Sequence, residues 1–169
     1  MKSKKYNITK GLFIVYIIIL TWIILFKLQF DVSSIETMNL RSINLVPFAG
    51  SLIINNKVDI SEIILNVAIF IPFGIYICML KEEWSFIKKV IPIFITSLAF
   101  ETLQYIFALG ASDITDLIGN TLGGIIGIAV FMLLSKIFKN NTIKIINILA
   151  FIVTIIVVLF LGLVIFANL

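Results

Sequence analysis

Five long apolar runs, separated by short polar segments, restrict this chain to one kind of fold. They cover residues of about 11–28, 60–80, 87–109, 117–138 and 143–166. A helix needs roughly 20 apolar residues, at about 1.5 Å each, to cross a hydrocarbon core of about 30 Å. Charged residues make up 13% of the chain, against roughly 25% in soluble domains. The sequence therefore predicts an all-α integral membrane protein with five transmembrane helices in a single domain, residues 1–169.

The basic residues indicate how these runs cross the membrane. Ten of the thirteen cations precede the first run or lie in the second and fourth connections between runs: Lys2, Lys4, Lys5, Lys10, Lys81, Lys88, Lys89, Lys136, Lys139 and Lys144. Because cytoplasmic loops are enriched in Lys and Arg, we expect a multi-pass protein of the cell membrane with a cytoplasmic N-terminus and an external C-terminus. The first run is longer than the apolar core of a signal peptide, so we expect it to remain as an anchor.

Two classes of binding site are excluded. The net charge of +4 does not indicate nucleic-acid binding, because that function needs Lys and Arg clustered on a water-exposed face, whereas these cations flank apolar runs. The chain has no histidine and a single cysteine, Cys78, so a Cys/His zinc site is excluded. We interpret Cys78 as a small apolar side chain within the helices. The expected partners are membrane lipids.

The longest hydrophilic connection, at about 29–59, holds two features. Ser33 and Glu36 have the spacing of a capping box, which predicts a short interfacial helix. Arg41 is the single arginine among thirteen basic residues, so a general need for positive charge would have been met by lysine. We therefore regard Arg41 as a candidate for bidentate binding of phosphate or carboxylate. The alternative is a solvated loop cation that pairs with nearby acids of this chain.

Polar side chains also lie within the second and third apolar runs, where they are costly. Glu62 and Asn66 are four residues apart, and Glu101 and Gln104 are three apart, so each pair shares a helix face. A carboxylate at the centre of a membrane helix costs about 3 kcal/mol on insertion scales, and such residues are usually functional. The alternative is a packing role, in which Glu101 forms a hydrogen bond with Gln104 or Asn66.

A third polar group begins the fourth apolar run. We expect residues 110–112 to form a tight outer turn, and Asp113 or the serine before it to cap the following helix. Asp113, Asp116 and Asn120 then fall at i, i+3 and i+7 on one stripe of that helix. A capping role alone would account for Asp113. It would not account for Asp116 and Asn120, which we regard as site residues.

Glycines form an adjoining stripe on the same helix. Gly119, Gly123 and Gly127 are spaced four residues apart, which gives two consecutive Gly-x-x-x-Gly units. Small residues at this spacing let another helix approach backbone to backbone. We interpret the stripe as a packing surface, either for another helix of this chain or for a second copy in a homo-oligomer.

These polar residues come from three runs and reach a similar depth, so we expect one polar pocket that opens to the outside. In an enzyme acting on a lipid-linked envelope precursor, Glu101 or Asp116 would be the general acid or base and Arg41 would hold an anionic group. Asp113 and Asp116 could also hold a divalent ion, although carboxylates at this spacing are common; no other cofactor is expected. A second hypothesis is a protein that sequesters an envelope lipid or an amphiphilic antibiotic. A third, a small transporter, is disfavoured because no inverted repeat is visible.

Four motifs in order resemble the VanZ-like family of bacterial membrane proteins. They are Asn44-Leu45-Val46-Pro47-Phe48, Asn66-x-x-x-Phe70-x-Pro72-Phe73-Gly74, Glu101-x-x-Gln104, and Asp113-Ile114-x-Asp116-x-x-x-Asn120-Thr121-x-Gly123-Gly124-x-x-Gly127. The resemblance covers about half the chain, residues 44–127. It implies a cell-envelope protein that gives low-level resistance to teicoplanin and related lipoglycopeptides.

The resemblance points to the same side chains as the topology. The candidate catalytic residues are Glu101, Asp113 and Asp116, and the candidate binding residues are Arg41, Asn44, Asn66, Gln104 and Asn120. Members of the family often carry an arginine in the turn before the first aspartate, where this chain has Ala111 and Ser112. This departure puts an anion-binding role for that turn in doubt and increases the interest of Arg41.

Overall fold

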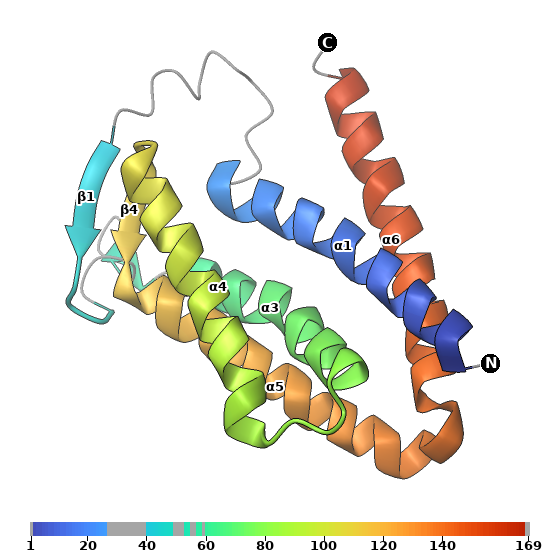
Figure 1. Ribbon diagram of the computed structural model, residues 1–169. Coiled ribbons are helices and arrows are strands. Elements are labelled where there is room, and N and C mark those ends of the chain that lie inside the picture. The colour runs from blue at the N-terminus through green and yellow to red at the C-terminus, as the bar shows by residue number, and fades with distance from the viewer. Residues whose placement is uncertain (1, 27–39, 49–52, 55–56, 59, 168–169) are drawn as a thin grey trace.

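The computed structural model describes residues 2–26, 40–48, 53–54, 57–58 and 60–167 (Figure 1). Its elements are α1 (Lys2–Phe26), β1 (Leu40–Asn44), β2 (Ile53–Ile54), β3 (Lys57–Val58), α3 (Ser61–Leu80), α4 (Phe86–Ile106), β4 (Leu109–Asp113), α5 (Ile114–Phe138), the 3₁₀ turn η1 (Lys139–Asn141) and α6 (Thr142–Ala167). The interfacial helix predicted from Ser33 and Glu36 lies outside the described residues. The chain is therefore mostly helical, as its apolar runs predict.

Within the described residues, three segments are long and apolar enough to cross a membrane: Tyr6–Leu25, Ser61–Leu80 and Ile114–Val164. The third spans 51 residues and contains α5 and most of α6, between which the chain turns at η1 (Figure 1). Helix α4 is not among the three, because Lys88, Lys89 and Glu101 interrupt its apolar sequence. These helices make the chain a membrane protein, while the five crossings and their orientation stay predictions.

The glycine stripe of α5 packs against α3. A Cβ atom on Gly123 would overlap the backbone carbonyl of Val67, and one on Gly127 would overlap that of Ile71. Gly74 of α3 makes the reciprocal approach to the backbone of α5. The two helices are therefore packed backbone to backbone, as small residues at this spacing allow. The stripe is occupied by a helix of the same chain, and a homo-oligomer formed through it stays a prediction.

Aromatic and aliphatic side chains from α1, α3 and α4 fill the core beside this pair. Leu20, Phe70 and Ile93 are almost fully buried, and the ring of Phe70 packs edge to face against Phe100, with ring centroids 6.5 Å apart. Tyr16 of α1 adds a polar contact, because its hydroxyl donates a hydrogen bond of 2.6 Å to the carbonyl of Ile69 in α3. These contacts place α1 and α4 against α3.

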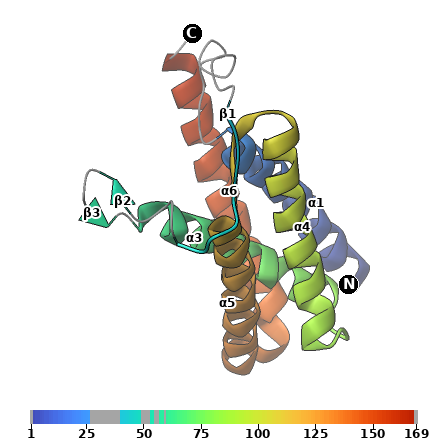
Figure 2. The same cartoon turned by 90° about the vertical axis from the view of Figure 1, so that its left-hand side faces the viewer.

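Strands β1 and β4 pair in parallel, with Arg41 opposite Gly110 and Asn44 opposite Asp113 (Figure 1). The prediction of a tight turn at residues 110–112 is therefore wrong, because these residues are extended in β4. The backbone N–H and C=O groups of these residues pair with β1, so they do not need the hydrogen bonds within a turn. The second pair, β2 and β3, is antiparallel and lies beyond the N-terminal end of α3 (Figure 2).

Candidate functional site

A cavity of about 410 Å³ lies between α1, α3, α4 and α5. It is lined by Ile23, Ile24, Ser61, Glu62, Leu65, Asn66, Ile69, Glu101, Gln104, Asp116 and Asn120. The structure thus brings five of the eight candidate site residues to one space, from three helices. The other three, Arg41, Asn44 and Asp113, lie on the adjoining β1–β4 pair.

Glu101 connects the cavity to the first residues of α5. Its side chain is 4% exposed, and its Oε2 atom accepts a hydrogen bond of 2.8 Å from the backbone N–H of Asp113. Asp113 is the last residue of β4 and the N-cap of α5, so this bond ties α4 to the start of the next helix. Glu101 therefore has a structural contact that the sequence did not predict, in addition to its place in the cavity wall.

Asp113 caps α5 and joins it to β1. Its Oδ1 atom accepts a hydrogen bond of 2.7 Å from the backbone N–H of Thr115, so Asp113 is the cap of the two residues, Ser112 and Asp113, that the sequence offered. Its Oδ2 atom accepts one of 3.0 Å from the Nδ2 of Asn44. Both oxygens are thus engaged in holding the strand pair to the helix. A catalytic role for Asp113 stays a prediction.

The segment after β1 lies against the start of α5. The Oδ1 atom of Asn44 accepts a hydrogen bond of 3.1 Å from the backbone N–H of Val46, while its Nδ2 atom donates the bond to Asp113 described above. The backbone N–H of Phe48 donates to the Oγ1 of Thr115 at 3.0 Å. Asn44, a predicted binding residue, therefore holds the segment after β1 in place beside the start of α5. The side chain of Arg41 lies outside the described residues, so its anion-binding role stays a prediction.

Gln104 and Asn120 are buried, and the structure gives each side chain a hydrogen-bond partner for its amide nitrogen alone. The Nε2 of Gln104 donates to the carbonyl of Ile24 at 3.0 Å, and the Nδ2 of Asn120 donates to the Oγ of Ser97 at 3.0 Å. Among the described residues, neither carbonyl oxygen of the two amides has a hydrogen-bond partner. Buried polar atoms are normally satisfied. Within the described residues, these two buried oxygens are therefore exceptions to that rule.

The orientation of Gln104 follows from its partner. The carbonyl oxygen of Ile24 can only accept a hydrogen bond, so the amide nitrogen of Gln104 must face it and the amide oxygen must face away. Asn120 is less restricted, because the hydroxyl of Ser97 can donate or accept. Gln104 is therefore a fixed acceptor, while Asn120 can present either group.

Two further residues belong to this region and are not among the candidate site residues predicted from the sequence, Glu62 and Ser97. Glu62 lines the cavity, and its spacing of four from Asn66 was the signal for including it. Ser97 is fully buried and orients Asn120; it lies on the face of α4 that carries Glu101, four residues later. Within the part of the chain that the structure describes, no three acidic or thiol side chains cluster closely enough to hold a metal ion. A divalent ion at Asp113 and Asp116 stays untested.

Comparison with known proteins adds two findings. The model of the VanZ/LLP1 family matches residues 13–136 of this chain. The chain is also similar to Protein VanZ of Enterococcus faecium, with 40% identity over 129 residues that cover 76% of each chain. No solved structure matches. The residues matched by the family model include every residue that lines the cavity.

Proposed function

The chain belongs to the VanZ/LLP1 family, and on that basis we propose that it gives low-level resistance to teicoplanin and related lipoglycopeptides by binding an amphiphilic molecule in the cavity around Glu101 and Asp116. The molecule is the antibiotic itself or a lipid of the envelope. Membership of the family and the resistance implied by the resemblance support the biological role, and the cavity supports the binding step.

The observation that carries the binding step is the convergence of five polar residues on one cavity: Asn66, Glu101, Gln104, Asp116 and Asn120. Its volume of about 410 Å³ is within the range of small-molecule sites, roughly 300–1,000 Å³. Polar side chains within membrane helices face the interior or a water-filled space, and mark binding or transport sites. The arrangement therefore favours a bound molecule over packing alone.

We further propose that the protein crosses the membrane five times with its N-terminus in the cytoplasm. The N-terminus, the connection between α3 and α4, and η1 lie toward one end of the molecule, and β1 and β4 lie at the other (Figure 1). The first end carries lysines in both connections, including Lys81 and Lys139. The positive-inside rule places such an end in the cytoplasm, so the cavity lies nearer the external surface.

Resistance measurements on matched variants test the binding site. Glu101→Gln and Asp116→Asn should lower the minimum inhibitory concentration of teicoplanin to that of cells without the protein. Glutamine keeps an oxygen that can accept the N–H of Asp113, so the fold should persist. Glu83→Gln makes the same charge change at an exposed position outside the cavity and should keep full resistance. Full resistance in both site variants, at equal amounts in the membrane, would remove the site from the proposal.

A second function, acid–base catalysis on a lipid-linked envelope precursor, is favoured by one observation. Glu101 and Asp116 line the same cavity, which is the arrangement that an acid and a base need. Mass spectrometry of envelope lipids and peptidoglycan precursors separates the two functions. A precursor whose mass changes with the wild type and not with Glu101→Gln identifies an enzyme. Resistance with unchanged precursors identifies a binding protein.

A further inference from the structure

A cavity of about 380 Å³ lies between α3, α4 and α5, near the connection that joins α3 to α4. Two lysines line it: Lys89, the fourth residue of α4, and Lys136, in the last turn of α5. No acidic side chain is among the described residues of its lining. We call this space the basic cavity.

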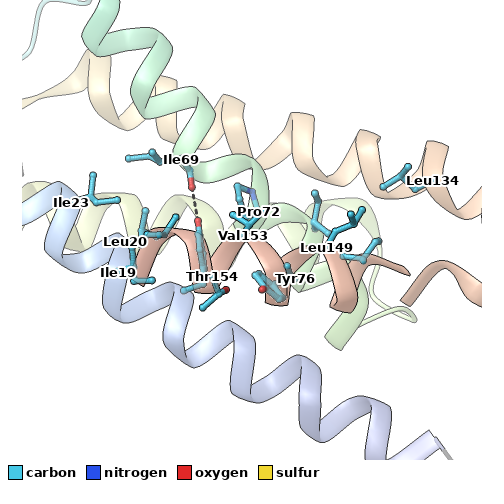
Figure 3. Close-up of a pocket in the computed structure, with 15 residues that line it drawn as sticks. Ile19, Leu20, Ile23, Ile69, Pro72, Tyr76, Leu134, Leu149, Val153 and Thr154 are labelled. Atoms are coloured by element: carbon cyan, nitrogen blue, oxygen red, sulfur yellow. Dashed lines mark hydrogen bonds between the residues drawn. The ribbon is translucent and has the colours of Figure 1, made fainter. Parts of the chain in front are cut away.

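The charge of the basic cavity distinguishes it from an apolar cavity of about 360 Å³ between α1, α3 and α6 (Figure 3). Hydrocarbon side chains such as Leu20 and Leu149 form most of the apolar walls. The hydroxyl of Tyr16 is engaged there with the carbonyl of Ile69, the bond drawn as a dashed line. Charged side chains are absent from the described lining of the apolar cavity. The basic cavity therefore has a means of selecting a charged ligand that the apolar cavity lacks.

Apart from the lysines, most of the basic cavity is apolar. Phe86 and Met132 line it and are more than half exposed, while Ile128 is almost fully buried. Ile128, Met132 and Lys136 follow one another at four-residue spacing along α5, so they share one face of the helix. This stripe changes from apolar to basic over about 12 Å, at about 1.5 Å per residue. It matches a ligand with a hydrocarbon chain and an anionic head.

The side chain of Lys89 is positioned by the connection before α4. Its Nζ atom donates a hydrogen bond of 3.2 Å to the carbonyl of Glu82. An ammonium group has three N–H donors, and this bond uses one of them. Glu82 and Glu83, the acids of this connection, are exposed and do not line the cavity. An anion beside Lys89 therefore meets N–H donors on a lysine that is already held in place.

A bound anion would also suit the start of α4. Lys88 and Lys89 lie in the first turn of this helix, which contains no acidic residue, and the N-cap residue Ser85 forms no side-chain hydrogen bond there. The N-terminal end of a helix carries partial positive charge, so cations next to it are unfavourable and anions are favourable. The two lysines therefore reduce the stability of this helix end, and a negative charge near them offsets that cost.

We propose that the basic cavity binds an anionic phospholipid, whose phosphate group lies between Lys89 and Lys136 and whose acyl chain lies along Met132 and Ile128. Lysines between membrane helices attract anionic headgroups, and the apolar stripe selects a lipid over free phosphate. This site is distinct from the polar cavity of the proposed function and lies toward the opposite end of α3. In the proposed orientation it faces the cytoplasmic leaflet, whose surface is negative.

Lipid titrations of matched variants test the headgroup. The lipid-depleted full-length protein in dodecyl maltoside is titrated with dioleoyl phosphatidylglycerol or dioleoyl phosphatidylcholine, and the shift in its thermal unfolding midpoint gives the affinity. The wild type should bind phosphatidylglycerol at least about tenfold more tightly, and the double variant Lys89→Gln with Lys136→Gln should lose this preference. Lys88→Gln with Lys144→Gln removes the same charge at two lysines that do not line the cavity, so it should keep the preference.

The outcomes of these titrations are decisive because the variants should fold. Glutamine in place of Lys89 keeps a donor for the carbonyl of Glu82. Equal binding of the two lipids by the wild type would overturn the proposal, and so would an unchanged preference in the variant of Lys89 and Lys136. Equal loss of the preference in both double variants would overturn it as well, since the attraction would then come from net charge and not from the cavity.

A polar substitution in the apolar stripe tests the position of the acyl chain. Met132→Asn should weaken phosphatidylglycerol binding about fivefold, because the chain loses an apolar neighbour. Leu133→Asn is the matched control, at a similarly exposed residue outside the cavity lining, and should bind as the wild type does. Inorganic phosphate should cause no shift in the unfolding midpoint of the wild type. Equal binding by the two variants, or a shift with phosphate equal to that with phosphatidylglycerol, would overturn a lipid as the ligand.

Discussion

Two helix pairs in this molecule are joined in opposite ways. Helices α3 and α5 meet backbone to backbone through glycines, with no space for a methyl group at Gly123 or Gly127. Helices α1 and α6 are joined by one buried polar pair, in which Thr9 and Asn147 exchange hydrogen bonds of 3.1 and 3.0 Å. Farther along, α1 and α6 diverge (Figure 1). The apolar cavity of about 360 Å³ lies between them and α3, beside the polar cavity around Glu101 and Asp116.

The walls of the two cavities therefore differ in how closely their helices are packed. Helix α3 lines both, and it meets α5 backbone to backbone at Gly123 and Gly127. Helix α6 lines only the apolar cavity, and most of its side chains beyond Asn147 are exposed. The polar cavity is thus bounded by the closest helix contact described here, and the apolar cavity by a helix whose outer side chains are exposed.

The largest effect should come from breaking the glycine contact. Gly123→Leu forces a side chain into the carbonyl of Val67, and overpacking of this kind costs about 3 kcal/mol. We expect little protein in the membrane and a thermal unfolding midpoint well below that of the wild type in detergent. Gly162→Leu is the matched control, because nothing lies within 4 Å of the position of its Cβ. A midpoint equal in the two variants would show that α3 and α5 are not in close contact.

A smaller effect is expected at the polar pair. Asn147→Leu leaves Thr9 without this partner, and interhelical hydrogen bonds in membranes contribute about 1 kcal/mol. The thermal unfolding midpoint should fall modestly, and teicoplanin resistance should persist because the polar cavity is intact. A double-mutant cycle with Thr9→Val isolates the pair. Additive effects of the two substitutions would mean that the two side chains do not interact.

The smallest effect is expected within the glycine stripe itself. A Cβ atom on Gly119 would lie 3.6 Å from the Cβ of Asn66, which is ordinary contact, unlike the overlap at Gly123. Gly119→Ala should therefore raise the free energy of unfolding by roughly 0.5–1 kcal/mol, because alanine favours the helix. The measurement is the same unfolding midpoint. A large loss of stability would show that the close contact extends to the cavity end of α5.

The sequence predicted the side chains that share a helix face, and missed most of the contacts between elements. The spacing of Glu101 and Gln104, and of Asp116 and Asn120, is set by the helical period, so their common orientation could be read directly. The glycine spacing likewise predicted a close helix partner. Nothing in the local pattern indicated that residues 110–112 would extend along β1.

The pairing of β4 with β1 could not be predicted because it joins segments that are far apart in the sequence. Asn44 and Asp113 are 69 residues apart, and their contact depends on the positions of α3 and α4 between them. The bond from Asp113 to Glu101 depends on the same placement. Local spacing carries no information about either contact, whereas it predicted a helix cap at Ser112 or Asp113, and Asp113 forms it with Thr115 two residues away.

The parallel pairing of β1 and β4 also sets the order in which the protein can be assembled. The ribosome releases β1 before α3 and α4, and β4 only after them, so β1 can pair only after both helices have been synthesised. Contacts between such distant segments form late, because the intervening chain must first be ordered. A nascent chain that stops before Asp113 lacks the partner of Asn44, the cap of α5 and the bond that ties Glu101 to that helix. These three hydrogen bonds can therefore form only after α3 and α4 have reached their final positions.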